Sequence, residues 1–206
     1  MGLPERIVDA YVYVDRGIMR GVNMGVHAWN WTTGETKSQL ANKLLTLAPI
    51  AETVGFSLPR RAEDDTLSYL VSGLFWLPFG ILVSHSTQRT NEKIEMCEEK
   101  AADSCLKDIY AEGMKELYKF LGALWGSDSF FQASLGTRAD YHSHSNLIAV
   151  GAAMRGASFY IMRADYLPPK KNCLRRGADK LKEIVESYKP QPTLGLAPAQ
   201  LSRENM

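Results

Sequence analysis

Cysteine is scarce in this chain of 206 residues, which contains only Cys97, Cys105 and Cys173. A small secreted domain held together by disulfides needs a denser, even-numbered set, so that class of protein is excluded. On one helix, Cys97 and Cys105 would share a face at a rise of about 12 Å, too far apart to form a disulfide. We therefore expect three small, buried side chains in a protein of a reducing compartment.

An excess of one charge is also missing. The chain carries 24 Lys and Arg against 23 Asp and Glu, for a net charge of +1. Proteins that bind nucleic acid non-specifically carry a clear basic excess, so we expect no nucleic-acid partner. Charged residues interrupt the N-terminal segment at Glu5, Arg6, Asp9 and Asp15. This pattern argues against a secretory signal or a transit peptide at the start of the sequence.

Sequence motifs of catalysis are lacking as well. The chain contains no phosphate-binding P-loop, no dinucleotide-binding glycine pattern, no nucleophile elbow, no HExxH and no CxxC pair. One metal site can be considered, formed by Asp140, His142 and His144, with His85 as a further ligand. A His-x-His pattern without a second ligand motif is more typical of a polar loop that leads into a helix. We therefore predict no metal, no cofactor and no enzymatic activity.

One long stretch, residues 66–88, contains no Asp, Glu, Lys or Arg, and charged residues border it on both sides. Its length of about 23 residues is enough to cross a bilayer as a tilted helix. Pro78 lies in its second half, and Gly73 and Gly80 flank its centre. Neighbouring helices would have to satisfy the carbonyl that Pro78 leaves free. In a soluble protein the same stretch would be a central core helix. We favour the membrane-spanning interpretation.

The rest of the chain has the three- and four-residue apolar spacing of amphipathic helices, which predicts an all-α fold. A capping box, Thr36 with Gln39, indicates the start of the second helix, and Pro49 should kink or divide that helix. Glu95 and Glu98 are expected on the solvent side of a later helix. Residues 127–146 are expected to form a loop. Besides the stretch 66–88, the predicted helices are 4–30, 37–57, 90–125, 146–164 and 173–188.

Small and aromatic residues indicate surfaces for close helix contact. Gly17, Gly21 and Gly25 recur every fourth residue, as do Ala149, Ala153 and Ala157. The tryptophans suit a membrane–water or protein interface, and we assign Trp29, Trp31 and Trp76 to this set.

Arg155 interrupts the helix 146–164 in its middle. If this helix crossed a membrane, Arg155 would need a carboxylate or carbonyl partner at depth. We favour instead a helix that packs closely on another protein.

The sequence predicts one helical domain over 1–188, anchored at 66–88, followed by a proline-rich extended tail over 189–206. In the last helix, Leu174, Leu181, Ile184 and Val185 are expected to face inward. We predict a non-catalytic accessory or assembly subunit of a larger membrane complex, with other subunits and lipid as partners. Because accessory subunits are abundant in energy-transducing membranes, we expect this protein in the inner membrane of an organelle or a bacterium. The alternatives are a soluble helical bundle with a ligand or His/Asp metal site, and an amphipathic membrane-remodelling protein.

Overall fold

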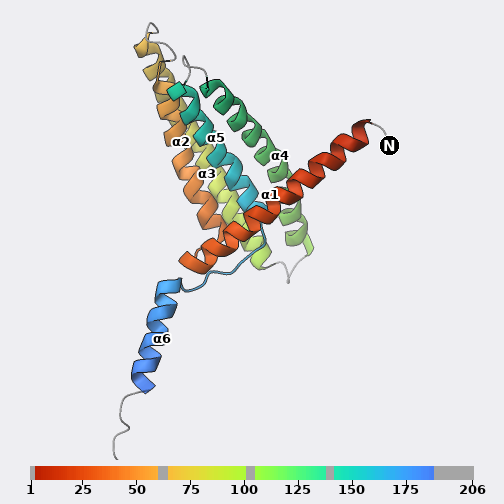
Figure 1. Ribbon diagram of the computed structural model, residues 1–206, viewed down its shortest axis with the longest axis vertical. Coiled ribbons are helices and arrows are strands. Elements are labelled where there is room, and N and C mark those ends of the chain that lie inside the picture. Colours follow the sequence, from red (N-terminus) through yellow and green to blue (C-terminus); the bar gives the residue numbers. More distant parts are fainter. Residues whose placement is uncertain (1–2, 60–64, 101–104, 138–141, 188–206) are drawn as a thin grey trace, which may run out of the picture.

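The computed structural model describes residues 3–59, 65–100, 105–137 and 142–187. Within these ranges the chain forms six α-helices and no strand (Figure 1), so the prediction of an all-α fold is confirmed. The helices are α1 (Leu3–Thr33), α2 (Lys37–Ser57), α3 (Thr66–Glu99), α4 (Cys105–Gly136), α5 (His142–Arg163) and α6 (Cys173–Ser187).

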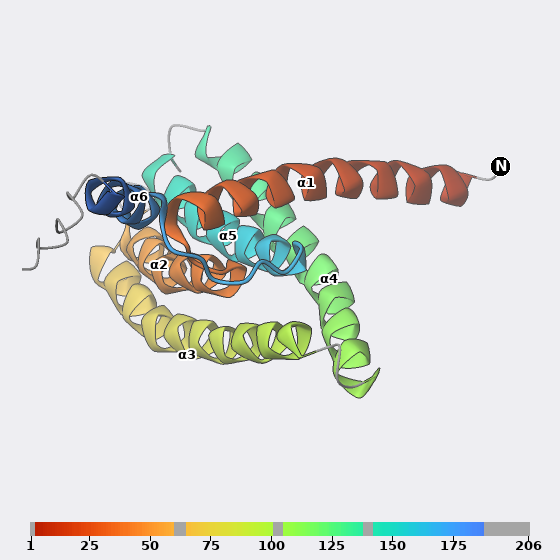
Figure 2. The ribbon, with the colours of Figure 1, turned by 90° about the horizontal axis from the view of Figure 1, so that it is seen from below.

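Helices α2 to α5 form the body of the molecule. Helix α5 packs between α2 and α4, and α3 lies along α2 and also touches α4 (Figures 1 and 2). The main hydrophobic cluster lies at the end of this body where α2 begins and α5 ends. Its buried members come from α1 to α5 and the residues that follow α5: Val26, Ala41, Ile94, Tyr118, Phe159, Ile161, Met162 and Ala164.

Helix α1 crosses this end of the bundle, and contacts along its middle and C-terminal parts hold it there (Figure 2). Val26 is buried in the hydrophobic cluster. The Asn30 side chain donates hydrogen bonds to the carbonyl oxygens of Glu35, at 3.0 Å, and Pro168, at 3.1 Å. Asp15 forms a two-bond ion pair with Arg163, both at 2.8 Å. The first turns of α1 project beyond the bundle (Figure 2).

The structure corrects two predicted boundaries. The predicted helix 90–125 is wrong, because α3 runs on from the apolar stretch to Glu99 and a separate helix, α4, begins at Cys105. No glycine or proline interrupts residues 81–99, so nothing in the backbone ends the helix there. Cys97 and Cys105 consequently lie on different helices. Cys97 and Cys173 are free thiols and are half-buried rather than buried.

The predicted loop 127–146 is also wrong, since α4 continues to Gly136 and α5 begins at His142. Gly126 directly follows the end of the predicted helix 90–125, and glycine costs about 1 kcal/mol in a helix interior. Here it lies inside α4, opposite Gly156 of α5: a β-carbon on Gly156 would sit 3.2 Å from the Gly126 nitrogen. Close packing of the two helices therefore outweighs the low helix propensity of Gly126.

The expectations for α2 and α6 had mixed outcomes. The capping box at Thr36 and Gln39 is confirmed. The structure shows no division of α2 at Pro49, because α2 is a single helix with Pro49 buried inside it.

The inward orientation predicted for the apolar residues of α6 is wrong. Helix α6 buries none of its residues, and its first residues contact α1. The tail 189–206 lies outside the described residues.

Candidate functional site: a buried ion pair inside the bundle

The most unusual feature of the interior is an ion pair between Glu52 of α2 and Arg155 of α5. Arg155 Nε donates to Glu52 Oε1 at 2.6 Å, and Arg155 Nη2 donates to Glu52 Oε2 at 2.8 Å. Each side chain retains only 2% of its solvent exposure. This two-bond geometry matches the planar guanidinium to the carboxylate, which is the strongest form of such a pair.

Side chains of two further helices complete the surroundings of the pair. The Trp76 indole N–H of α3 donates to Glu52 Oε2 at 2.9 Å, and Arg155 Nη1 donates to the Ser84 hydroxyl at 3.1 Å. The guanidinium carbon of Arg155 lies 5.3 Å from the ring centre of Trp125 on α4, within range of a cation–π interaction. All four helices of the bundle thus contribute to one polar cluster.

Glycines make room for this cluster. A β-carbon on Gly151 would lie 2.4 Å from Glu52 Cγ and 3.0 Å from the Ala48 carbonyl oxygen, so only glycine lets α2 and α5 approach so closely. A β-carbon on Gly80 of α3 would lie 3.1 Å from Pro49 Cβ and 3.4 Å from Arg155 Nη2. Gly80 therefore brings α3 against the buried proline of α2 and the ion pair behind it.

The Glu52–Arg155 pair cancels its own charge. Arginine stays protonated in proteins, and a buried charge without a partner is costly. Both groups are buried among four helices. The pair can therefore hold these helices in one relative arrangement.

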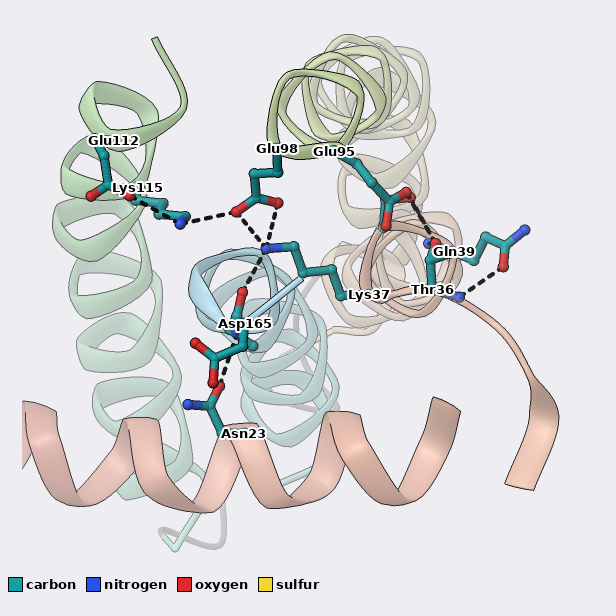
Figure 3. A network of polar contacts seen from close by, with 11 residues as sticks. Asn23, Thr36, Lys37, Gln39, Glu95, Glu98, Glu112, Lys115 and Asp165 are labelled. Atoms are coloured by element: carbon teal, nitrogen blue, oxygen red, sulfur yellow. Dashed lines mark hydrogen bonds and ion pairs between the residues drawn. The ribbon is translucent and has the colours of Figure 1, made fainter. Parts of the chain in front are cut away.

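A second polar cluster lies at the end of the bundle where α2 begins (Figure 3). The fully buried ammonium of Lys37 contacts Glu98 of α3 at 2.7 Å and also donates to the Ala164 carbonyl oxygen. Lys115 of α4 reaches the same carboxylate at 2.9 Å. Burial lowers the pKa of Lys37, and the charge of Glu98 opposes that shift. For Lys115, burial is the largest single influence and acts in the same direction, but the hydrogen bonds and charges of Glu98 and Glu112 together outweigh it, so the pKa is raised.

Two acidic residues of this cluster were expected on a solvent face and are not there. Glu98 joins the lysines just described, and Glu95 accepts hydrogen bonds from the hydroxyls of Thr36, at 3.0 Å, and Ser38 (Figure 3). Because α3 extends past residue 88, its last turns pack beside the start of α2. The carboxylates then face the N-terminal turn of α2, whose dipole favours negative charge.

The glycine row of α1 lies open in the structure. A β-carbon added at Gly17, Gly21 or Gly25 would meet no other atom within 4 Å. Trp29, close to this row, is half-buried and donates its indole N–H to Glu35 at 3.1 Å. Trp31 is exposed, and the Arg176 guanidinium stacks 5.3 Å from its ring centre.

The alanine row of α5 is divided between two environments. Ala149 is buried beside α4, where its carbonyl oxygen accepts a hydrogen bond from Ser129 at 2.9 Å. Ala153 and Ala157 lie on the outer face of α5 and are exposed. Two glycines of α5, Gly151 and Gly156, instead make close contacts with the backbones of α2 and α4. Trp76, the last aromatic residue of the predicted set, packs on Phe56 and Phe79 and bonds Glu52.

The proposed metal ligands are not brought together in the described part of the chain. His144 is buried, with Nδ1 at 3.1 Å from the Leu58 carbonyl oxygen and its ring edge-on to Phe56. His85 lies on the exposed side of α3. Asp140 lies outside the described residues, and the His142 side chain is not described. Among the described residues, no three His, Cys, Asp or Glu side chains are grouped to hold a metal ion.

Sequence reasoning missed Glu52, and it left Arg155 without a partner. One signal could have found the pair: Glu52 is the single charged residue of 44–58, and Arg155 is the single charged residue of 145–162. Two opposite charges that are isolated in apolar helices are expected to form an ion pair with each other.

Comparison with known proteins finds no match: no family model, no curated protein and no solved structure is similar to this chain.

Proposed function

We propose that this protein is a non-catalytic accessory or assembly subunit of a larger membrane complex. The observation that carries the proposal is the exposure of α3. Among the described helices, α3 alone is long and apolar enough along its length to cross a membrane, and only 11% of its most apolar window is buried. Leu74 is 67% exposed and Phe75 is 76% exposed. Their apolar side chains point away from the protein and are available to lipid.

The same exposure counts against the soluble alternative. A core helix of a soluble bundle would bury its leucines and phenylalanines, since a buried side chain of this size stabilises the fold by about 1.5–3 kcal/mol. Helix α3 instead turns its small residues, Gly73 and Gly80, toward α2. Small residues at helix contacts and large apolar residues on the outside are typical of membrane helices.

Two further surfaces support a subunit role. The apolar stripe of α6 is exposed along its whole length, at Leu174, Leu181, Ile184 and Val185. The N-terminal half of α1 exposes the apolar side chains of Val8, Tyr13, Val14 and Ile18 beside its open glycine row. Large uncovered apolar surfaces mark contact sites for other proteins or for membranes. Other subunits and lipid are therefore the proposed partners, and an energy-transducing inner membrane is the proposed location.

The proposal is tested by isolating the tagged full-length chain from its native membrane in a mild detergent and measuring the mass of the intact particle. We expect a particle heavier than one chain, with the same companion proteins in repeated preparations. A matched pair of variants locates the contact: Leu181→Ser on the apolar stripe of α6 should reduce the companion proteins, and Lys180→Ser beside it should not. A stable monomer that carries no companion would contradict the proposal.

A further inference from the structure

The outer faces of α2, α4 and α5 carry almost no charge over a long, shared band. On α2, the exposed residues of 44–58 are Thr46, Leu47, Ile50 and Val54. On α5, the exposed residues of 145–162 are Val150, Ala153 and Ala157. On α4, the large exposed residues of 120–136 are Phe120, Leu124, Phe130 and Phe131. A helix on the surface of a water-soluble bundle exposes charged residues there, so this band is built for an apolar surrounding.

The charged groups of α2 and α5 within the band are turned inward and paired. Glu52 and Arg155 bind each other at 2.6 Å and 2.8 Å, and neither is exposed. This is the arrangement that a charged residue at membrane depth requires: it faces the interior of the bundle and has a partner of opposite charge. Trp76 and Ser84, from the apolar stretch of α3, add hydrogen bonds to the same pair. The pair therefore lies at the level of the stretch that is most suited to span the bilayer.

Charged clusters mark one end of the band. The Lys37–Glu98–Lys115 cluster and the Asp15–Arg163 pair lie where α2 begins and α5 ends. Residues 145–162 give a helical rise of roughly 27 Å, and residues 120–136 give roughly 25 Å, against a hydrocarbon core of about 30 Å. At the other end, the charged residue Asp65 caps the start of α3.

We infer that α2, α4 and α5 enter the bilayer together with α3, so that four helices are embedded and lipid acyl chains cover their outer faces. The inference rests on the proposed membrane role and deepens it. The Glu52–Arg155 pair then holds an embedded bundle together. The chain passes the membrane an even number of times, which places Cys97 and Arg163 on one side and Ser57 and Thr137 on the other.

Asp128 is the exception on α4. It is half-buried and forms no ion pair with the described residues. A lone carboxylate at the centre of a membrane helix is costly. Helix α4 therefore enters as part of the bundle, through its contacts with α5, and not as an independently inserting segment.

Among the described helices, α3 alone is long and apolar enough on average to span a membrane, because an average counts every side of a helix. In α2, α4 and α5, the polar residues that lower the average, such as Glu52, Ser129 and Arg155, face other helices and never meet lipid.

The test is to place a nitroxide spin label at single cysteines in a cysteine-free, full-length chain reconstituted in phosphatidylcholine vesicles. Collisions with oxygen report lipid, and collisions with a water-soluble nickel chelate report water. The labelled variants are Ile50→Cys on α2, Leu124→Cys on α4 and Ala153→Cys on α5. Leu74→Cys on α3 reports the membrane role itself, and Glu116→Cys, eight residues before Leu124 on α4, is the matched control outside the band.

We expect oxygen to dominate at Ile50, Leu124, Ala153 and Leu74, and the nickel chelate to dominate at Glu116, with at least a several-fold difference in the ratio of the two collision rates. If Leu74 reports lipid while Ile50, Leu124 and Ala153 report water, α3 is a lone anchor, and the four-helix inference is overturned while the proposed function stands. If Leu74 also reports water, the proposed function fails with it.

Discussion

Replacing Arg155 by Met tests the central ion pair most sharply. The substitution keeps a long side chain of similar reach and removes the charge. It leaves the Glu52 carboxylate at 2% exposure with one remaining donor in the cluster, the Trp76 indole N–H. Breaking a buried pair from one side costs about 3–5 kcal/mol, because the remaining charge is stranded. A typical domain has about 5–15 kcal/mol of stability, so the loss should be large and easily measured.

The reverse substitution, Glu52→Met, should cost about as much, while the double variant should lose no more than about 2 kcal/mol, because no charge is then left buried. The sum of the two single losses in unfolding free energy should therefore exceed the loss of the double variant by at least about 3 kcal/mol. The assay is unfolding by a graded increase of sodium dodecyl sulfate in mild detergent micelles, followed by circular dichroism. The control is Lys43→Met, since the Lys43–Glu35 pair leaves the lysine 53% exposed and should contribute at most about 1 kcal/mol. If both single variants behave like this control, the pair does not hold the bundle.

Three smaller predictions use the same unfolding assay. Gly151→Ala should destabilise the bundle by about 1–3 kcal/mol through overpacking, while Gly21→Ala, which meets no atom, should stabilise α1 by about 0.5–1 kcal/mol; equal effects would contradict the packing described. The bond to Arg163 lowers the pKa of Asp15, so the contribution of this pair to stability should be complete above pH ~4 and be lost as the pH falls further. Asp15→Asn should therefore make the loss of stability below pH ~4 shallower. An unchanged pH profile would argue against the pairing. Thr36→Ala should cost about 0.5–2 kcal/mol by removing the cap of α2, and an unchanged stability would mean that the capping box contributes nothing.

Local patterns predicted the helices well where the signal was local. The capping box at Thr36 located the start of α2 to the residue, because cap and partner lie within one turn. The boundaries failed where tertiary contacts decided them. Gly126 has the sequence signature of a helix end, but its contact with Gly156 keeps α4 helical. Pro49 has the signature of a break, but it is buried against α3 and α2 continues past it.

The site could be predicted only in part, because its members are far apart in the sequence. Arg155 stood out as a lone charge in a helix of small residues, and the need for a partner followed from that. The partner, Glu52, lies 103 residues away, and no periodicity connects the two. Trp76 was selected as an interface residue, whereas the structure gives it a bond to Glu52. Pairing of this kind depends on which helices are neighbours, and a single sequence does not record that.

Alkaline carbonate extraction of the native membrane that contains the full-length protein shows whether the chain is embedded in that membrane. Carbonate strips proteins that are held by charge or by other proteins, whereas an embedded helix stays with the lipid, because withdrawing its apolar surface into water is too costly. We predict that the protein remains in the membrane pellet. Its complete release into the soluble fraction would contradict the account.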